Sequence, residues 1–395
     1  MNIVLFIDSL RIGGAQWQFA QLAEGLTQRG HQVTFATIHG GGPYWDWLSE
    51  RGNVRLQGLY QERGITMAHR VVQLLSAPRR LAALLREREA DVVYSALHTS
   101  DFIAWLAGQR RCGLPVAWSL RASKQAVPWK QRVSVELCRL ASGKLPLILA
   151  NSHAGLEAYQ KRGFQPRQTA VIPNGIDVDI FRPDAKAGQA VRKAWGVGGD
   201  APVLGSIGRL MPVKNHALFL DAAARLAAKR PEARFVCVGS GPSGYTRQLQ
   251  EQADALKLKD KVIWAGARHD MRAVYNALDL LCLSSRSEGF PNVVAEAMAC
   301  GVPPVATQVG DVGLMIGETG KTVHAATPNA LAEALFDLAS LPSTARLDLG
   351  QKARTRIVER FSMEAMVRHT EAHLESLCLG RPSAGPEALM PDPAA

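Results

Sequence analysis

Two glutamates eight residues apart form the sharpest candidate site of this 395-residue chain. Glu288 and Glu296 lie in the run SEGFPNVVAEA of residues 287–297. Gly289 permits a tight turn and Pro291 suits the first position of a helix, so we expect Glu288 on a loop and Glu296 on the following helix. At a rise of 1.5 Å per residue, the two carboxylates would lie on the order of 10 Å apart along the axis. The alternative is two solvated glutamates that flank a helix start.

The backbone between these glutamates supplies complementary chemistry. The N–H groups of residues 292–294 would open a helix, and such an end binds anions such as phosphate. Carboxylates are good acceptors for hydroxyl groups. The order of carboxylate, phosphate site and carboxylate therefore suits a ligand with hydroxyls at both ends and a diphosphate between them, which describes a sugar nucleotide.

Two cations follow a predicted buried strand at 203–207. Arg209 and Lys214 belong to the run GRLMPVKN of residues 208–215. At the carboxyl end of a strand, Arg209 can hold a diphosphate through two hydrogen bonds, while Lys214 acts as a point charge. Negative charge grows on a departing nucleoside diphosphate, so fixed cations there would stabilise the transition state. A solvated loop is the alternative for this run taken by itself.

Three further patterns are weaker. Gly13 and Gly14 separate a predicted strand from a helix, where paired glycines let backbone amides approach a phosphate or a sugar. Residues 239–244, GSGPSG, fit GxGxxG after a strand, but the proline is unusual there and no acidic strand end follows convincingly at the expected distance, so a dinucleotide site is not favoured. Asp177 and Asp179 have the DxD spacing of a metal site, yet they lie in a turn that Asp177 would cap.

Composition sets the class of protein. The chain is 47% hydrophobic and 21% charged, with a mean hydropathy of −0.04, which is typical of a folded chain of two domains. No apolar run approaches the roughly 18 residues of a membrane-spanning helix. The stretch Met1–Leu10 carries Asp8, so it indicates a buried strand rather than a secretion signal. Six cysteines form no CxxC pair, so we expect a reducing cytosol and no structural zinc.

Positive charge is concentrated in the first half of the chain. Residues 1–182 hold 22 Lys and Arg against 13 Asp and Glu, whereas the remainder holds 24 against 22. The excess suggests a polyanionic partner, whether nucleic acid, anionic lipid or a phosphorylated acceptor; a basic surface without a partner is the alternative. Residues 110–144 carry eight basic residues against one acidic residue. Trp118 and Trp129 lie among them and residues 127–140 predict an amphipathic helix, the combination expected of an element at an anionic membrane surface.

Short apolar runs alternate with amphipathic segments in both halves, which predicts parallel sheets built from βαβ units. In the first half the expected strands are 2–7, 32–37, 91–94, 115–118, 147–151 and 169–172, and the expected helices 15–30, 78–89 and 102–109. A turn at 173–177 and a helix at 184–195 precede strands at 203–207, 234–238, 261–264, 280–283, 304–306 and 321–323, with helices at 216–229 and 291–299. The fold class is therefore α/β, with two doubly wound parallel sheets. Ligands of such sheets bind at the carboxyl ends of the strands, so we expect a site in the cleft between two facing sheets.

Together these pieces resemble the family-4 retaining glycosyltransferases of GT-B fold, of the bacterial surface-polysaccharide type. The likeness spans nearly the whole chain: the Gly-Gly-Ala loop, VIPNGID at 171–177, GRLMPVKN at 208–215, VGSGP at 238–242 and the E-x7-E run, which is the specific one. It implies two facing Rossmann-like domains at 1–180 and 181–361. The C-terminal helix at 362–379 would pack back onto the first domain, and residues 380–395 would form a disordered tail.

The resemblance also implies a role for each site residue. Glu288 would contact the donor sugar near the reacting carbon, and Glu296 the ribose hydroxyls. Arg209 and Lys214 would bind the diphosphate, and His98, at the end of a predicted strand, would touch the transferred sugar, although a lone histidine there more often has a structural role. Arg121 would hold the acceptor. The other donor-binding positions would be Gly14, Gly208, Gly239, Gly241, Phe290, Pro291, Asn292, Val293 and Val294.

The function implied is retaining transfer of a sugar from a nucleoside-diphosphate sugar, with UDP expected, to a hydroxyl of a lipid-linked glycan or polysaccharide precursor. Attack would occur on the face of the leaving group, with the donor phosphate as base. Because cations already neutralise the diphosphate, we expect no metal and no cofactor. The enzyme would be cytoplasmic and peripheral at the inner face of the plasma membrane. A GT-B-fold sugar-nucleotide epimerase is the alternative enzyme; a nucleic-acid-binding protein is the other alternative, but no recognised motif accompanies the basic half.

Overall fold

The computed structural model describes residues 1–61, 67–121, 132–198 and 201–381, and the chain divides into two compact units. The first unit comprises Met1–Gly175 together with the segment that begins at Met363, and the second comprises Ile176–Ser362. The first crossing between units thus follows Gly175 rather than residue 180. Most of the tail expected at 380–395 lies outside the described residues, as do Lys124, Trp129 and Lys130.

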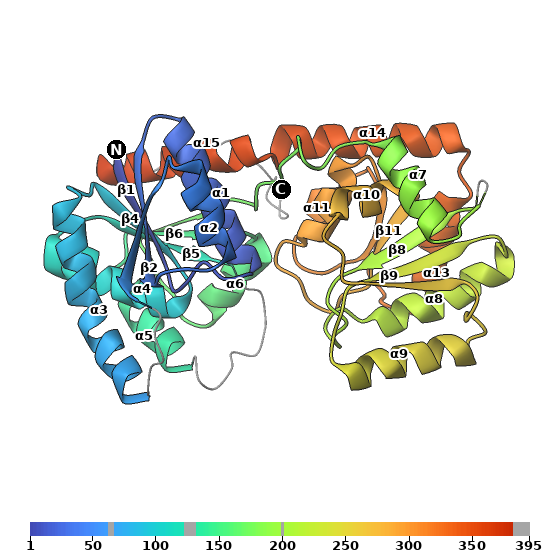
Figure 1. Cartoon of the computed structure of the whole chain (residues 1–395), viewed down its shortest axis with the longest axis horizontal. Helices are drawn as coiled ribbons and strands as arrows, with labels where there is room; N and C mark the ends of the chain where they lie inside the picture. Colours follow the sequence, from blue (N-terminus) through green and yellow to red (C-terminus); the bar gives the residue numbers. More distant parts are fainter. Residues whose placement is uncertain (62–66, 122–131, 199–200, 382–395) are drawn as a thin grey trace. The chain divides into compact units, whose positions relative to one another are not determined.

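A seven-stranded, fully parallel sheet forms the centre of the first unit (Figure 1). Its strand order is β3-β2-β1-β4-β5-β6-β7. The strands are β1 (Asn2–Ile7), β2 (Gln32–His39), β3 (Arg55–Tyr60), β4 (Val92–Ala96), β5 (Val116–Leu120), β6 (Leu147–Ala150) and β7 (Gln168–Val171). Both faces of this sheet are covered, which explains why its central strands read as continuous apolar runs.

Each face of the first sheet packs on its own set of helices. One face packs on α1 (Gly14–Gln28), α2 (Pro43–Arg51) and α15 (Met363–Cys378). The other packs on α3 (Met67–Glu87), α4 (His98–Ala104), the π-helix η1 (Trp105–Cys112), α5 (Arg132–Ser142) and α6 (His153–Lys161). Helix α15 lies against α1, where Val367 occupies the space that a side chain at Gly25 would need. Its Glu371 pairs with Arg29 and His31, each at 2.6 Å.

The sequence misses some elements of the first unit. The sequence pattern predicts neither helix α2 nor strand β3. For β3 the reason is that it is an edge strand, with a half-exposed pattern and a central Gly58. A side chain at Gly58 would meet the backbone of Gly40 at 2.8 Å, so the glycine marks a close approach of two backbones. Helix α3 also begins well before Pro78, which lies inside it; the prediction took proline for a helix start.

The second unit repeats this architecture with six parallel strands in the order β10-β9-β8-β11-β12-β13. The strands are β8 (Val203–Ile207), β9 (Arg234–Val238), β10 (Val262–Gly266), β11 (Leu280–Leu283), β12 (Pro304–Thr307) and β13 (Lys321–Val323). Helices α8 (His216–Lys229), α9 (Ser243–Ala255) and α13 (Pro328–Ala339) pack on one face. Helices α10 (Met271–Asn276), α11 (Asn292–Ala299), α12 (Val312–Ile316) and α14 (Ser343–Arg360) pack on the other, and α7 (Ala185–Ala194) packs on α10.

Both sheets reverse their strand order at one place, between β1 and β4 in the first and between β8 and β11 in the second. The connections from these strands go to helices on opposite faces of the sheet, and ligands of open α/β sheets bind at the carboxyl edge of such a reversal point. The segments after β1 and β4 lead to Gly14 and His98, the first residues of α1 and α4, and the loops after β8 and β11 contain Arg209 and Glu288. The topology of each unit thus brings its predicted site residues to its own reversal point.

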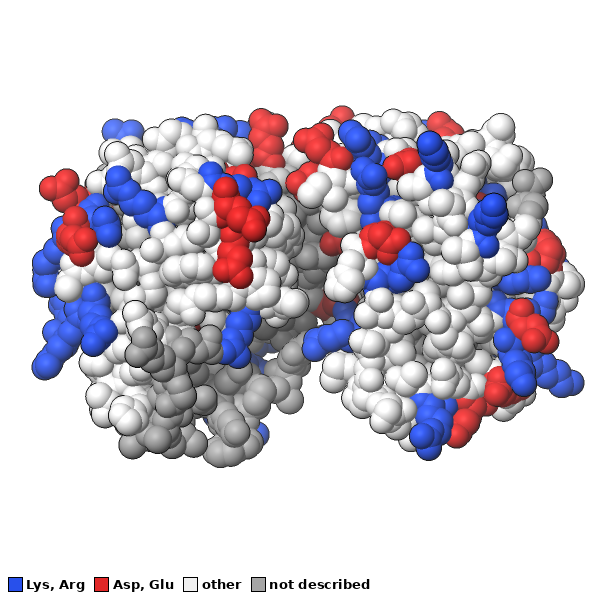
Figure 2. Space-filling model, in the orientation of Figure 1, with Lys and Arg blue, Asp and Glu red and all other residues white. Residues whose placement is uncertain are grey.

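The surface carries charges of both signs. On the face shown in Figure 2, basic and acidic side chains are interspersed over both units. The charged residues of the second unit include pairs at the surface, for example Arg268 with Asp270 and Lys352 with Asp348. Such pairs contribute little to stability because water and salt screen them.

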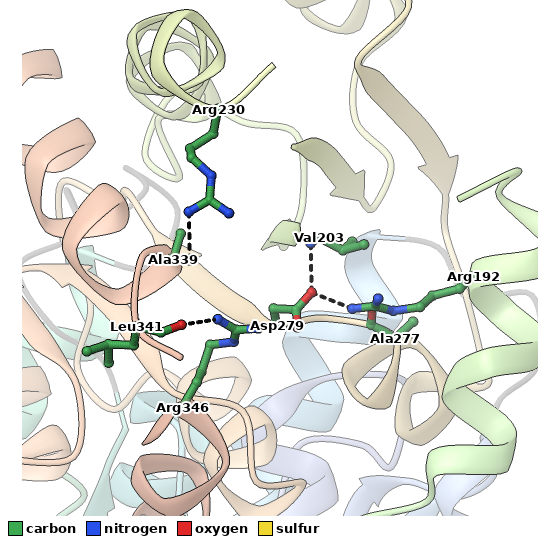
Figure 3. Close-up of polar contacts among 8 residues, drawn as sticks. All are labelled: Arg192, Val203, Arg230, Ala277, Asp279, Ala339, Leu341 and Arg346. Atoms are coloured by element: carbon green, nitrogen blue, oxygen red, sulfur yellow. Dashed lines mark hydrogen bonds and ion pairs between the residues drawn. The ribbon is translucent and has the colours of Figure 1, made fainter. Parts of the chain in front are cut away.

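A partly buried network around Asp279 anchors the amino ends of two central strands of the second sheet (Figure 3). Asp279 precedes β11 and accepts a hydrogen bond from the amide of Val203, the first residue of β8, at 2.8 Å. Its carboxylate also pairs with Arg192 of α7 and, at 3.3 Å, with Arg346 of α14. Arg192 further donates to the carbonyl of Ala277 at 2.8 Å, and Arg346 donates to that of Leu341 at 3.1 Å. One carboxylate therefore joins two helices to the strands that carry the reversal point.

We expect Asp279→Ala to destabilise the second unit by about 2–4 kcal/mol. The substitution removes the carboxylate that accepts from two partly buried guanidinium groups and from a strand amide. The midpoint of urea denaturation measures this loss. Asp348→Ala is the matched control: it removes an exposed aspartate that pairs with Lys352 one helical turn away, and it should change stability by less than about 0.5 kcal/mol. Equal midpoints for the two variants would contradict a structural role for the network.

Candidate functional site

The loops after β8 and β11 are joined by hydrogen bonds and an ion pair. The amide of Arg286 donates to the carbonyl of Val213 at 2.8 Å. The hydroxyl of Ser284 donates to the carbonyls of Lys214 and Asn215 at 3.1 and 3.0 Å. Lys214 Nζ lies 2.6 Å from Glu288 Oε1. The structure thus brings together two of the predicted catalytic residues, Lys214 and Glu288, at the reversal point of the second sheet.

The carboxylate of Glu288 is held in one orientation. Its Oε1 accepts hydrogen bonds from Lys214 and from the hydroxyl of Ser285, the latter at 2.6 Å. Ser285 is itself fixed, because Thr307 at the end of β12 donates to its carbonyl at 2.7 Å. A side chain at Gly310, which has a φ of +54°, would clash with the carbonyl of Glu288. Within the described part of the chain Oε2 has no partner, so that oxygen is available to accept from a ligand.

Arg209 differs from Lys214 in its surroundings. Its side chain is exposed, and it forms no hydrogen bond or ion pair with any residue that the structure describes. A guanidinium group in this state can bind an anion without first giving up a protein partner. Of the two cations predicted to bind a diphosphate, Arg209 is therefore available, whereas Lys214 would be shared between the ligand and Glu288.

The glycines predicted to bind the donor are explained by the packing of neighbouring loops. Gly208 and Gly239 have φ values of +152° and +139°, which L-residues rarely adopt. A side chain at Gly239 would clash with the carbonyl of Gly208, and one at Gly241 with that of Leu210. The loops after β8 and β9 are thus in backbone contact, and the amide of Leu210 donates to the carbonyl of Ser240 at 2.9 Å. A role for these glycines in ligand binding remains a prediction.

Glu296 projects from α11 and contacts a buried tyrosine. Its Oε2 accepts a hydrogen bond from the hydroxyl of Tyr275 at 2.6 Å, and Tyr275 is fully buried. Burial raises the pKa of the Glu296 carboxyl, an effect that the bond from Tyr275 opposes. The carboxylate is therefore fixed on one side by α10, which orients it as an acceptor for a neighbouring hydroxyl donor.

The amino end of α11 departs from the prediction in three respects. Pro291 precedes the helix, which begins at Asn292. The amide of Val294 donates to the carbonyl of Pro291 at 3.0 Å, so this amide is already occupied and the predicted set of three is wrong. Phe290 is 7% exposed and its ring packs on Phe361, with centroids 5.8 Å apart. The side chain of Phe290 is therefore part of the core, and only its backbone could contact a donor.

Sequence reasoning missed His216, the first residue of α8. It is 1% exposed, and neither ring nitrogen has a partner among the residues that the structure describes. Burial, with a smaller effect of Lys214, lowers its pKa to about 4, so the ring is neutral at neutral pH. Asn215 before it has a φ of +53°, which turns the chain from the Lys214 loop into the helix. The only signal in the sequence was a histidine directly after that loop.

In the first unit, Gly13 and Gly14 lead from β1 into α1. Gly13 has an extended backbone before the first turn of α1, and Gly14 is the first residue of the helix, with no atom near the position of a Cβ. No acidic residue lies in the first turn, so the positive end of the helix dipole is uncompensated there. The neighbouring Ile12 is 80% exposed. The contact between Gly14 and a donor stays a prediction.

His98 begins α4 directly after β4, and its ring is engaged. His98 Nε2 lies 2.9 Å from the hydroxyl of Tyr159 in α6. The thiol of Cys138 in α5 donates to the carbonyl of His98 at 3.1 Å. Burial, with a smaller effect of Arg162, lowers the pKa of His98 to about 4. At neutral pH the imidazole is therefore neutral.

Arg121, predicted to hold the acceptor, contacts its own unit. Its Nε donates to the hydroxyl of Ser119 at 2.9 Å and its Nη1 to Asn174 Oδ1 at 2.8 Å. The guanidinium carbon lies 5.1 Å from the ring centroid of Phe19, and burial lowers the pKa of the group. These contacts link β5 to the segment after β7, so a structural role is sufficient to explain the residue.

The DxD pattern caps a turn. Asp177 Oδ1 accepts hydrogen bonds from the amides of Asp179 and Ile180 at 3.1 and 2.9 Å. The interpretation of Asp177 as a turn cap is therefore confirmed. Among the described residues, a possible metal-ligand group of His31, Glu371 and Glu375 lies instead between the end of α1 and α15, where Arg29 already pairs with Glu371.

Two families match most of the chain in succession. Residues 12–180 match the family described as Glycosyltransferase Family 4, and residues 201–340 match that described as Glycosyl transferases group 1. The D-inositol 3-phosphate glycosyltransferase of Kribbella flavida is 35% identical over 221 residues, which is 53% of this chain and 51% of that protein. The enzyme of that name from Geodermatophilus obscurus is 31% identical over 289 residues, or 64% and 62%. The matched part thus spans about half to three fifths of these relatives.

Solved structures show the same two-domain architecture. HepE of Anabaena in complex with UDP superposes with a TM-score of 0.80 at 21% identity, over 95% of this chain and all of that one. WaaG, a glycosyltransferase involved in lipopolysaccharide biosynthesis, superposes with a TM-score of 0.68 at 18% identity, over 94% and 99%. These likenesses establish the fold, which is GT-B. The chain belongs to the glycosyltransferases, with a family 4 domain in its first half and a group 1 domain in its second.

Proposed function

We propose that this protein transfers a sugar, with retention of configuration, from a UDP-sugar to a hydroxyl of a lipid-linked glycan or polysaccharide precursor. The observation that carries the proposal is the Lys214–Glu288 ion pair at the reversal point of the second sheet, with exposed Arg209 in the same loop as Lys214. UDP as the nucleotide is supported by HepE, a protein of the same fold whose structure contains it.

The chemistry of this pair fits a departing nucleoside diphosphate. Arg209 and Lys214 would face the two phosphates, and their charge counts most when the leaving group becomes negative. Glu288 would accept from a hydroxyl of the donor sugar through the oxygen that Lys214 and Ser285 leave unoccupied. Glu296, oriented by Tyr275, would accept from the ribose hydroxyls.

Retention is proposed from the resemblance to the family-4 retaining glycosyltransferases. A glycosidase places two carboxylates on opposite sides of the bond that breaks, whereas Glu288 pairs with Lys214. From the resemblance we infer attack from the face of the leaving group, with the donor phosphate accepting the proton of the acceptor hydroxyl. The C–O bond to the diphosphate breaks as the bond to the acceptor oxygen forms.

For the donor site, we expect Glu288→Gln to lower kcat by about 10²–10³-fold, since it removes a charged contact near the reacting carbon. Glu296→Ala should instead raise the donor KM about tenfold with a smaller change in kcat, as expected for one lost hydrogen bond to a hydroxyl. Release of UDP and formation of glycoside are measured together. Glu251→Ala, an exposed glutamate of α9, is the matched control.

Two outcomes would contradict the assignment. Equal and mild losses of kcat in both variants would show that neither glutamate has the proposed place. Conversion of the donor without any acceptor, with no net release of UDP, would show an epimerase in place of a transferase.

We propose that the reaction needs no metal, because Arg209, Lys214 and the amino end of α11 supply the positive charge that Mg²⁺ would otherwise provide. Transfer should be unchanged in EDTA, whereas Arg209→Ala and Lys214→Ala should each lose about 10²-fold in kcat. Arg247→Ala, an exposed arginine of α9, controls for a general effect of charge. Loss of activity in chelator and its recovery with Mg²⁺ or Mn²⁺ would overturn this part of the proposal.

We further propose that the first unit docks on an anionic membrane surface. Helix α5 exposes Val133, Leu137 and Leu140, at 69%, 37% and 65%. Helix α3, on the same face of the sheet, exposes Val72 and Leu75 at 63% and 76%. Singly exposed apolar residues are ordinary, but a set on two helices of one face supports an interfacial surface.

The positive charge of helices α3 and α5 favours an anionic membrane over another protein as the partner of this surface. Basic side chains gather in Figure 2 along the edge where Figure 1 places α3, and Arg132 is exposed at the start of α5. One expected component is wrong: Trp118 is fully buried in β5 and cannot insert into lipid. Among the described residues no helix is both long and apolar enough to cross a membrane. The docking that we propose is peripheral and at the inner face of the plasma membrane.

Sedimentation with vesicles tests the docking. We expect binding to vesicles containing anionic lipid, with release as salt rises, because each basic residue near such a surface contributes at most about 1 kcal/mol. Binding should weaken in Val133→Asn/Leu140→Asn and when Lys124, Lys130 and Arg132 are changed to Glu. Leu347→Asn in α14, where the leucine is 71% exposed, is the matched control in the second unit. Equal binding to neutral and anionic vesicles, or none to either, would remove this claim and leave the transferase proposal intact.

A further inference from the structure

The position of His98 is maintained against a strained backbone. Leu97, which precedes it, has a φ of +72°. This backbone conformation is energetically unfavourable for a residue with a bulky side chain, and it persists only where surrounding contacts enforce it. The carbonyl of Leu97 accepts from the amide of Asp101 at 2.9 Å, and that of His98 accepts from the thiol of Cys138 at 3.1 Å. Contacts from α4 and α5 thus hold the backbone of His98 where β4 ends.

The ring of His98 is held by a single residue of a third helix. Tyr159 in α6 is 5% exposed, and its hydroxyl lies 2.9 Å from His98 Nε2. The two rings also pack on each other, with centroids 5.6 Å apart, and Phe164 packs edge-on against Tyr159 at 5.0 Å. The hydroxyl of Tyr159 has no other hydrogen-bond partner among the described residues.

These contacts favour one position for the ring proton of His98. Burial and the nearby Asp101 raise the pKa of Tyr159, so its hydroxyl keeps its proton. The imidazole is neutral, because burial lowers its pKa to about 4, and a neutral imidazole has one donor and one acceptor nitrogen. Since this hydroxyl has no other partner among the described residues, donation to Nε2 is the arrangement that gives its proton an acceptor. In that arrangement the ring proton of His98 resides on Nδ1.

We propose that Tyr159 is a positioning residue that fixes His98 as the Nδ1–H tautomer, so that the ring presents an N–H donor to a ligand hydroxyl. The inference rests on the proposed function for the identity of that hydroxyl. The tautomer of His98 can be tested without any ligand. Tyr159→Phe is the variant for this test, because it keeps the packing with His98 and Phe164 and removes only the hydroxyl.

Nitrogen NMR of the ligand-free protein labelled with ¹⁵N-histidine tests the tautomer directly. We expect the His98 signals, assigned by their loss in His98→Asn, to show a protonated Nδ1 and an unprotonated Nε2 in the native protein. In Tyr159→Phe they should shift toward the Nε2–H form. Tyr60→Phe is the matched control, since that hydroxyl donates to the carbonyl of Gln73 in the same unit, and it should leave the His98 signals unchanged. A native Nε2–H tautomer, or one that Tyr159→Phe does not alter, would overturn the proposal.

Kinetics with a UDP-sugar donor test the consequence. Tyr159→Phe should lower kcat about five- to tenfold, with a change of less than about twofold in donor KM, as expected for an oriented hydrogen bond that matters in the transition state. His98→Asn should retain more activity than His98→Gln, because the asparagine amide reaches the place of Nδ1–H. Adding Tyr159→Phe to His98→Asn should have no further effect, whereas additive losses would show that the two residues act independently. Absence of transfer in the native protein would defeat the proposed function and leave the tautomer measurement standing.

Discussion

The ion pair between Lys214 and Glu288 holds together the part of the second unit from which its chemistry is inferred. The two residues lie far apart in the sequence, but β8 and β11 are neighbours in the sheet. The chain leaves β8 and β11 toward opposite faces of the sheet. No helix that the structure describes therefore packs between the carboxyl ends of these two strands, and side chains connect the loops that follow them. Ser284, Ser285 and Thr307 add hydrogen bonds from the same loops. Side chains that such contacts already orient need less ordering when a ligand binds.

Backbone contact between loops is the second constraint on this edge of the sheet. Gly239 and Gly241 lie where a Cβ would clash with carbonyls of the loop after β8, and Gly310 lies against the carbonyl of Glu288. A motif such as GxGxxG therefore has a packing explanation that is complete without a nucleotide. A substitution at Gly239 or Gly241 would therefore disturb the loop that carries Arg209 and Lys214, whether or not the glycines themselves contact a ligand.

Much of the fold could be predicted from the sequence, because central parallel strands are apolar throughout and their bounds are marked by turns; β8, β9, β11 and β13 begin and end where expected. The reversal points also follow from the order of such strands. What could not be predicted depends on contacts distant in the sequence. Edge strand β3 has a mixed pattern, Trp118 is in the core rather than at a surface, and Tyr159 reaches His98 across 61 residues. No local pattern marks such partners.

The two reversal points use opposite electrostatic solutions at corresponding positions. Glu288 follows β11 and His98 follows β4, each on the strand beside the one that begins its series. Glu288 is a carboxylate that is paired with the cation Lys214, so charge is present at this position and is compensated within the second unit. Burial, with a smaller effect of Arg162, lowers the pKa of His98 and keeps its ring neutral; a neutral ring suits a hydrogen-bond partner that carries no charge.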